Sequence, residues 1–117
     1  MNSTALAQQA YAPTAAPLRS DRKVEYAVIG RITARLKSAV DSGDFAKLVN
    51  ALHENRTLWR KLGLDVADPG NLLPDDLRAR LIYLADFTDH HTRKVLRREA
   101  TALALIEVNT AILRGLK

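Results

Sequence analysis

Apolar side chains recur at helical spacing over most of this chain, and this periodicity constrains the fold more than any other feature. Val24, Val28, Ile32 and Leu36 form one such stripe, and three further stripes follow it. Residues three or four apart share one face of an α-helix, so each stripe predicts a helix that buries that face. The pattern therefore predicts an all-α fold, a small four-helix bundle.

Turn and capping residues divide the pattern into four predicted helices. Gly43 suits the left-handed position after the first helix, and Asp44 suits the cap of the second. The stretch Asp68-Pro69-Gly70-Asn71 stops the second helix, because the residue before a proline avoids helical angles. Either Asn71 or Leu73 caps the third helix, with Pro74 in its first turn. We expect the helices to span about residues 20–42, 45–67, 74–98 and 101–115.

Residues 1–18 differ from the remainder of the chain. They are rich in Ala, contain Pro13 and Pro17, and show little periodicity, so we expect a flexible N-terminal arm before a single helical domain over residues 19–117. Ala10-Tyr11-Ala12 resembles a signal-peptide cleavage site, but no basic residue precedes Arg19 and the apolar stretch is short. No apolar run reaches the roughly 20 residues that span a bilayer. We therefore expect a cytoplasmic protein without membrane insertion.

Composition excludes several classes of protein. The chain has no Cys, which removes disulfides, thiolate catalysis and Cys-ligated metals. Aromatic residues make up only 5%, and Gly and Pro are scarce, which argues against an all-β fold. A net charge of +5 fits an acidic partner, RNA or simply a soluble surface.

Few residues have the type and spacing that a metal site or a catalytic site needs. Asp86 and His90 share a helical face and His91 adjoins them, but a zinc site needs three or four ligands and His53 is far away. We interpret this group as a solvated polar face and expect no metal. No Ser, His and Asp arrangement and no glycine-rich phosphate loop is present. We therefore expect no enzyme activity and no cofactor.

Basic residues form two clusters, which either contact phosphates or form a solvated face. Phosphate binding needs basic stripes, but Lys and Arg near a helix C-terminus also complement its dipole. Aromatic residues that could stack on bases are not interleaved with them, so RNA binding is the weaker interpretation. The clusters are Arg93, Lys94, Arg97 and Arg98, and Arg56, Arg60 and Lys61.

Five aromatic and amide residues leave alternatives open. Trp59 lies on an apolar stripe and is expected in the core. Tyr83 and Phe87 share a helical face, and they either pack together or line a groove. Asn55 and Asn109 interrupt apolar stripes; each either sets helix register or reaches a partner's backbone, because a buried amide must be hydrogen-bonded.

The last predicted helix is apolar over more than half of its circumference. A helix of this kind is either central to the core or shares its surface with a partner. One stripe consists of Leu105, Val108, Ile112 and Leu116, and the adjacent stripe of Ala102, Ile106, Asn109 and Leu113.

Four segments, in this order and at this spacing, resemble FlaF, the flagellar biosynthesis regulator family of α-proteobacteria. They are "EYAVIGRITARLKSA" (25–39), "NRTLW" (55–59), "DPGNLLPDDLRARLIYLADF" (68–87) and "LIEVNTAILRGLK" (105–117). The resemblance implies a small, helical, cytoplasmic protein that takes part in flagellin synthesis and secretion. It also implies that flagellin is bound in a chaperone-like way, that FlbT is a further partner, and that there is no catalytic residue.

The apolar helices and the resemblance suggest one hypothesis. Unassembled flagellin exposes amphipathic terminal helices, which a bundle with surplus apolar surface can receive in a groove. Basic residues at the rim of this groove would steer an acidic partner towards it. The alternative is a post-transcriptional regulator that contacts flagellin mRNA through a basic helix face. The candidate partner-binding residues are Tyr83, Phe87, Ile106, Asn109, Leu113, Arg78, Arg80, Arg93, Lys94 and Arg97.

Overall fold

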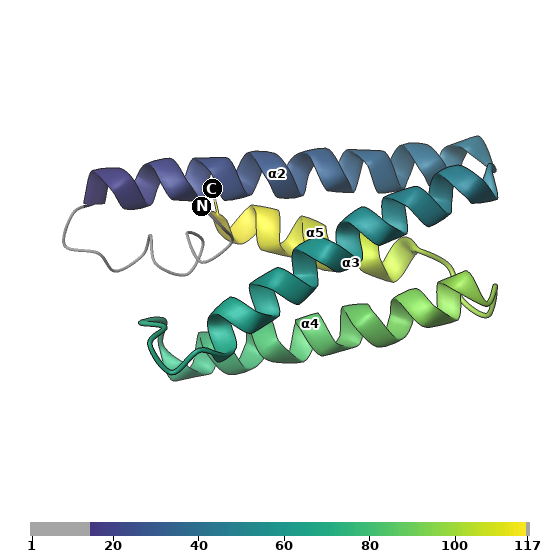
Figure 1. Cartoon of the computed structure of the whole chain (residues 1–117). Coiled ribbons are helices and arrows are strands. Elements are labelled where there is room, and N and C mark those ends of the chain that lie inside the picture. Colours follow the sequence, from purple (N-terminus) through teal and green to yellow (C-terminus); the bar gives the residue numbers. More distant parts are fainter. Residues whose placement is uncertain (1–14, 117) are drawn as a thin grey trace.

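Four helices make up the described part of the chain, which confirms the predicted all-α four-helix fold. The structure is a computed structural model that describes residues 15–116, with side chains described over residues 25–115. Consecutive helices run in opposite directions, and α3 crosses obliquely between α2 and α4 (Figure 1). The helices are α2 (Ala15–Ser42), α3 (Phe45–Ala67), α4 (Asp75–Leu96) and α5 (Leu103–Leu116).

The first of these helices starts earlier than the sequence pattern predicts. It begins at Ala15 rather than at Ser20, and so includes the last four residues of the predicted arm. Pro17 lies in the first turn, where the amide proton that proline lacks would have no helical partner in any case. The remainder of the predicted arm, residues 1–14, lies outside the described residues.

The turn from α2 to α3 forms as its sequence predicts. Gly43 adopts a left-handed φ of 68°, and its N–H donates to the Val40 carbonyl at 3.2 Å. The Asp44 carboxylate then accepts hydrogen bonds from the amides of Ala46 at 2.9 Å and Lys47 at 3.3 Å. These bonds satisfy two of the amides that every helix start leaves unpaired.

The loop from α3 to α4 differs from the prediction in its cap. Pro74 is the N-cap of α4, in place of Asn71 or Leu73, and no side chain caps the helix. The Asn71 side chain is used within the loop, where it accepts from the Leu73 amide at 2.9 Å and donates to the Asp65 carbonyl at 3.1 Å. Arg78, one of the candidate partner-binding residues, donates to the Val66 carbonyl at 2.9 Å and so stabilises the end of α3.

The helix α4 ends at Leu96, two residues before the predicted Arg98. Arg98 takes a left-handed φ of 62°, its amide donates to the Val95 carbonyl at 2.9 Å, and the Glu99 amide donates to the Lys94 carbonyl at 2.8 Å. This pair of bonds is the pattern that closes helices whose next residue is left-handed. The Arg98 guanidinium lies 4.1 Å from the centre of the Phe45 ring, which offsets part of the backbone cost.

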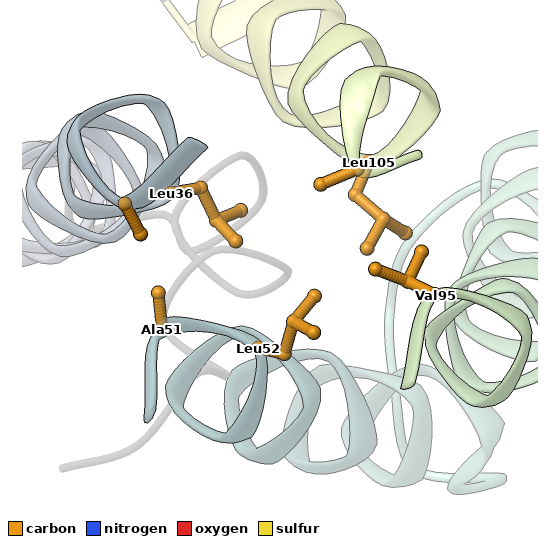
Figure 2. Close-up of a cluster of buried hydrophobic side chains, with 7 residues drawn as sticks. Leu36, Ala51, Leu52, Val95 and Leu105 are labelled. Atoms are coloured by element: carbon orange, nitrogen blue, oxygen red, sulfur yellow. The ribbon is translucent and has the colours of Figure 1, made fainter. Parts of the chain in front are cut away.

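Two hydrophobic clusters fill the interior. Backbone contacts join α2 to α3, α3 to α4, α4 to α5 and α5 to α2, so α3 and α5 face each other across the core. Side chains from all four helices converge on the first cluster, as Figure 2 shows. Its buried residues are Leu36, Ala39, Ala51, Leu52, Val95, Ala102 and Leu105. The second cluster consists of Trp59, Leu62, Val66, Leu73 and Leu81.

The interior also contains buried polar side chains, which we call the polar layer. The Trp59 indole N–H donates to Asn109 Oδ1 at 2.8 Å, and the Asn109 amide donates to Asn55 Oδ1 at 2.8 Å. On α4, the buried Thr92 hydroxyl donates to the Thr88 carbonyl at 2.6 Å. Asn55 and Asn109 are both fully buried, so their side chains bond across the bundle rather than to a partner.

Candidate partner-binding groove

The outer surface between α3 and α4 is shaped by one glycine. The helix α3 continues through Gly63 to Ala67, and a Cβ placed on Gly63 would lie 3.0 Å from the Cβ of Ala85. Two small residues at a contact allow two helix backbones to approach closely. The absent side chain at Gly63 therefore leaves a depression where the two helices meet.

This depression is a groove of about 460 Å³, which we call the α3–α4 groove. Leu64 forms one wall and Ile82 the other, and their side chains are 75% and 41% exposed. Two large aliphatic side chains exposed beside a concave surface are a feature of helix-binding sites. The lining residues are Trp59, Arg60, Gly63, Leu64, Ile82, Ala85, Asp86 and Asp89.

A single carboxylate gathers three arginines at one end of the groove. Asp89 accepts from Arg56 Nε at 2.8 Å and from Arg93 at 2.6 Å, and it lies 3.1 Å from Arg60. The hydrogen bond from Arg56, together with the charges of the three guanidiniums, lowers the pKa of Asp89 despite its partial burial. The structure thus joins members of the two predicted basic clusters, which lie on different helices.

Several predicted partner-binding residues lie on other sides of α4. Tyr83 is 68% exposed, but it follows Ile82 in sequence and so points about 100° around the helix from the groove. Phe87 does not pack on Tyr83; it stacks on His91, with ring centroids 5.2 Å apart. Arg80 and Lys94 are exposed on the same helix.

The predicted residues of α5 lie largely inside the bundle. Ile106 packs against the first hydrophobic cluster, and Leu113 is half-buried. Asn109 is buried and hydrogen-bonded to Trp59 and Asn55. The described side chains of the two apolar stripes of α5 are therefore mostly part of the core. The exposed large apolar side chains of the described residues are Tyr26, Val40, Leu64, Leu72, Leu77, Ile82, Tyr83 and Leu103.

Not all of the groove residues could be predicted from the sequence. Leu64 lies off the buried face of α3, which carries Trp59, Leu62 and Val66, and a glycine such as Gly63 by itself indicates only a weak point in a helix. An off-stripe Leu next to a mid-helix Gly is the signal that could have indicated a groove, but the pairing with Ile82 depends on how α4 packs.

The remaining candidates form contacts within the fold. Arg97 donates to Glu99 at 3.1 Å, and His91 Nε2 lies 2.8 Å from the Thr101 carbonyl. His90 Nδ1 lies 3.5 Å from the Asp86 carboxylate. Within the described residues, no group of three or more His, Cys, Asp or Glu side chains is placed to hold a metal ion.

The fold and the groove define an all-α bundle with an open groove between α3 and α4, lined by Leu64 and Ile82 and bordered at one end by the arginines around Asp89. Comparison with known families adds the identity: the family model "Flagellar protein FlaF" matches residues 7–116, and the chain belongs to this family. This match confirms the resemblance and implies a role in flagellar biogenesis. No curated protein and no solved structure matches the chain significantly. Within the described residues, no helix has both the length and the apolar character needed to cross a membrane.

Proposed function

We propose that this protein binds flagellin before its export from the cytoplasm and, in a chaperone-like way, couples flagellin synthesis to secretion. The observation that carries this proposal is the α3–α4 groove with its exposed Leu64 and Ile82. An amphipathic helix lays apolar residues at positions i, i+3, i+4 and i+7 into such a groove. Membership of a flagellar family supports flagellin as the client, and its amphipathic terminal helices suit this chemistry.

The basic cluster of Arg93, Lys94, Arg97 and Arg98 supports RNA binding less well. Arg93 is paired with Asp89, Arg97 is bonded to Glu99, and Arg98 lies on the Phe45 ring. The two ion pairs lower the net positive charge that this cluster presents to phosphates, and no aromatic side chain is interleaved with it for stacking on bases. We therefore favour flagellin over flagellin mRNA, and FlbT enters as an outcome of the test.

A pull-down from cell extract, with and without nuclease, tests this proposal directly. We expect flagellin to be retained in both samples. Capture that depends on intact RNA, or capture of FlbT without flagellin, would contradict flagellin binding.

A matched pair of leucines tests the groove itself. Leu64→Asp should weaken flagellin binding at least about tenfold, because a buried contact of more than 1 kcal/mol is replaced by a charge. Leu103→Asp is the control, since Leu103 is also exposed, at 58%, but lies on α5. Isothermal titration with purified flagellin measures both. Equal affinities for the two variants would show that the groove is not the binding site.

A further inference from the structure

The two ends of the α3–α4 groove carry opposite charge. At the basic end, Arg56, Arg60 and Arg93 surround the single carboxylate of Asp89, which leaves an excess of positive charge. Beyond the lining residues at the other end, where α3 ends and α4 begins, lie Asp68, Asp75 and Asp76. Asp75 precedes Ile82 by seven residues and therefore shares its helical face. We call these two groups the basic end and the acidic end.

The acidic end is not neutralised within the fold. The Asp75 side chain is 99% exposed, and its nearest cation, Arg78, is 3.9 Å away. Arg78 keeps its positive charge while it donates to the carbonyls of Val66 and Asp68, and it offsets one carboxylate. The carboxylates of Asp68 and Asp76 add two further negative charges, so the end is acidic overall.

Other charges near the groove do not cancel this difference. Asp86 lines the groove between Ile82 and Asp89, and its negative charge reduces, but does not reverse, the excess positive charge of the three arginines around Asp89. The dipoles of α3 and α4 oppose each other, because the two helices are antiparallel. The side-chain charges therefore decide the electrostatic polarity of the groove.

A helix that docks in this groove brings its own dipole, positive at its N-terminus and negative at its C-terminus. Resting on the proposed function, we propose that the groove binds the amphipathic client helix in one orientation. The N-terminus of the client lies at the acidic end and its C-terminus at the basic end, so the client runs parallel to α4 and antiparallel to α3. Favourable interactions at both termini give a preference of about tenfold over the reversed helix.

The absence of Cys from the chain makes this orientation measurable. A spin label is attached to Ala67→Cys near the acidic end or to Thr57→Cys near the basic end, both on exposed residues of α3. The two positions are separated by about 15 Å along the helix. The probe is a synthetic, isotope-labelled peptide that carries the N-terminal amphipathic helix of flagellin.

The label at residue 67 should broaden NMR signals from the first turn of the bound peptide, and the label at residue 57 those from its last turn. The reversed pattern, or equal broadening at both ends, would overturn the orientation while leaving the groove as the binding site. A peptide and an intact flagellin that both fail to bind would overturn the proposed function, and the orientation with it.

A charge-reversal variant separates electrostatic orientation from a structural effect. Asp75→Lys with Asp76→Lys should reduce the roughly tenfold orientation preference to near one, because the acidic end is lost. Asp41→Lys is the control, since it reverses an exposed Asp on α2. If the double variant binds the peptide with its orientation preference unchanged, the charge-based inference is wrong.

Discussion

At the scale of single residues, Gly30 within α2 and Gly43 directly after its end differ in backbone conformation. Gly43 has a φ of 68°, whereas Gly30 lies in the interior of α2. A Cβ added at either position meets no other atom of the described chain within 4 Å. Substitutions at the two positions therefore report backbone conformation without interference from packing.

We predict opposite effects for the two alanine variants. Gly43→Ala should lower the free energy of unfolding by about 1 kcal/mol, because a left-handed conformation is costly for a residue with a Cβ. Gly30→Ala should raise it by about 0.5–1 kcal/mol, because glycine weakens a helix interior. Urea denaturation measures both. Shifts of the same sign would contradict this account of the α2–α3 turn.

Asp89 on α4 forms ion pairs with Arg56 and Arg60 on α3 and so connects the two helices. Its pKa is lowered below the ordinary value of 3.8, chiefly by the hydrogen bond from Arg56. A carboxyl whose pKa is lower in the folded state stabilises the fold at pH values above its unfolded pKa. That contribution is lost as the pH falls through the folded pKa.

We predict that the wild-type protein loses stability more steeply below about pH 4 than Asp89→Asn does, because only the wild type must protonate this carboxyl on acidification. The free energy of unfolding, measured between pH 2 and pH 7, checks this. Asp76→Asn, at an exposed position on the same helix, serves as a control. Parallel profiles for wild type and Asp89→Asn would contradict the assignment.

At the scale of elements, one side chain sets the register of α5. Asn109 accepts from Trp59 and donates to Asn55, so that α5 is tied across the core to α3. A shift of α5 by one residue would separate these partners and bury them unpaired. The polar layer thus specifies one register, which the apolar stripes alone would leave less well defined.

We predict that Asn109→Leu lowers the free energy of unfolding by about 1–3 kcal/mol, because it leaves polar groups of Trp59 and Asn55 buried without a partner. Adding Asn55→Leu should cost less than the sum of the single changes, with a coupling of about 0.5–3 kcal/mol. The exposed Asn50 provides a control, since Asn50→Leu should change stability by less than about 0.5 kcal/mol. Additive effects in a denaturation cycle would exclude the coupled pair.

At the scale of the whole molecule, core leucines and groove leucines have different roles. Leu105 is fully buried among side chains from all four helices, whereas Leu64 is 75% exposed on the groove wall. Stability and partner binding are therefore carried by different residues.

We predict that Leu105→Ala destabilises the fold by about 2–5 kcal/mol, through lost burial and the cavity it leaves. Leu64→Ala should change stability by less than about 0.5 kcal/mol. Thermal and chemical denaturation measure both. A strongly destabilised Leu64→Ala protein would mean that this side chain belongs to the core rather than to a binding surface.

The sequence by itself determined the elements. Gly43, Asp44 and the acidic pair Asp75 and Asp76 act on backbone groups within a few residues of themselves, so their effect on helix ends follows from local spacing. The earlier start of α2 and the use of Asn71 within its loop show the limit of such signals. Several residues near each helix end can serve the same purpose, and their tertiary surroundings choose among them.

Only the tertiary structure decided what these elements bring together. Asp89 meets Arg56 across 33 residues of sequence, and Asn109 meets Asn55 across 54. The groove between Leu64 and Ile82 exists because Gly63 lets α4 approach α3 closely. Helical spacing predicts which side chains share a face of one helix. Which faces then pair with each other depends on the packing of the whole bundle, and a local sequence pattern does not contain this information.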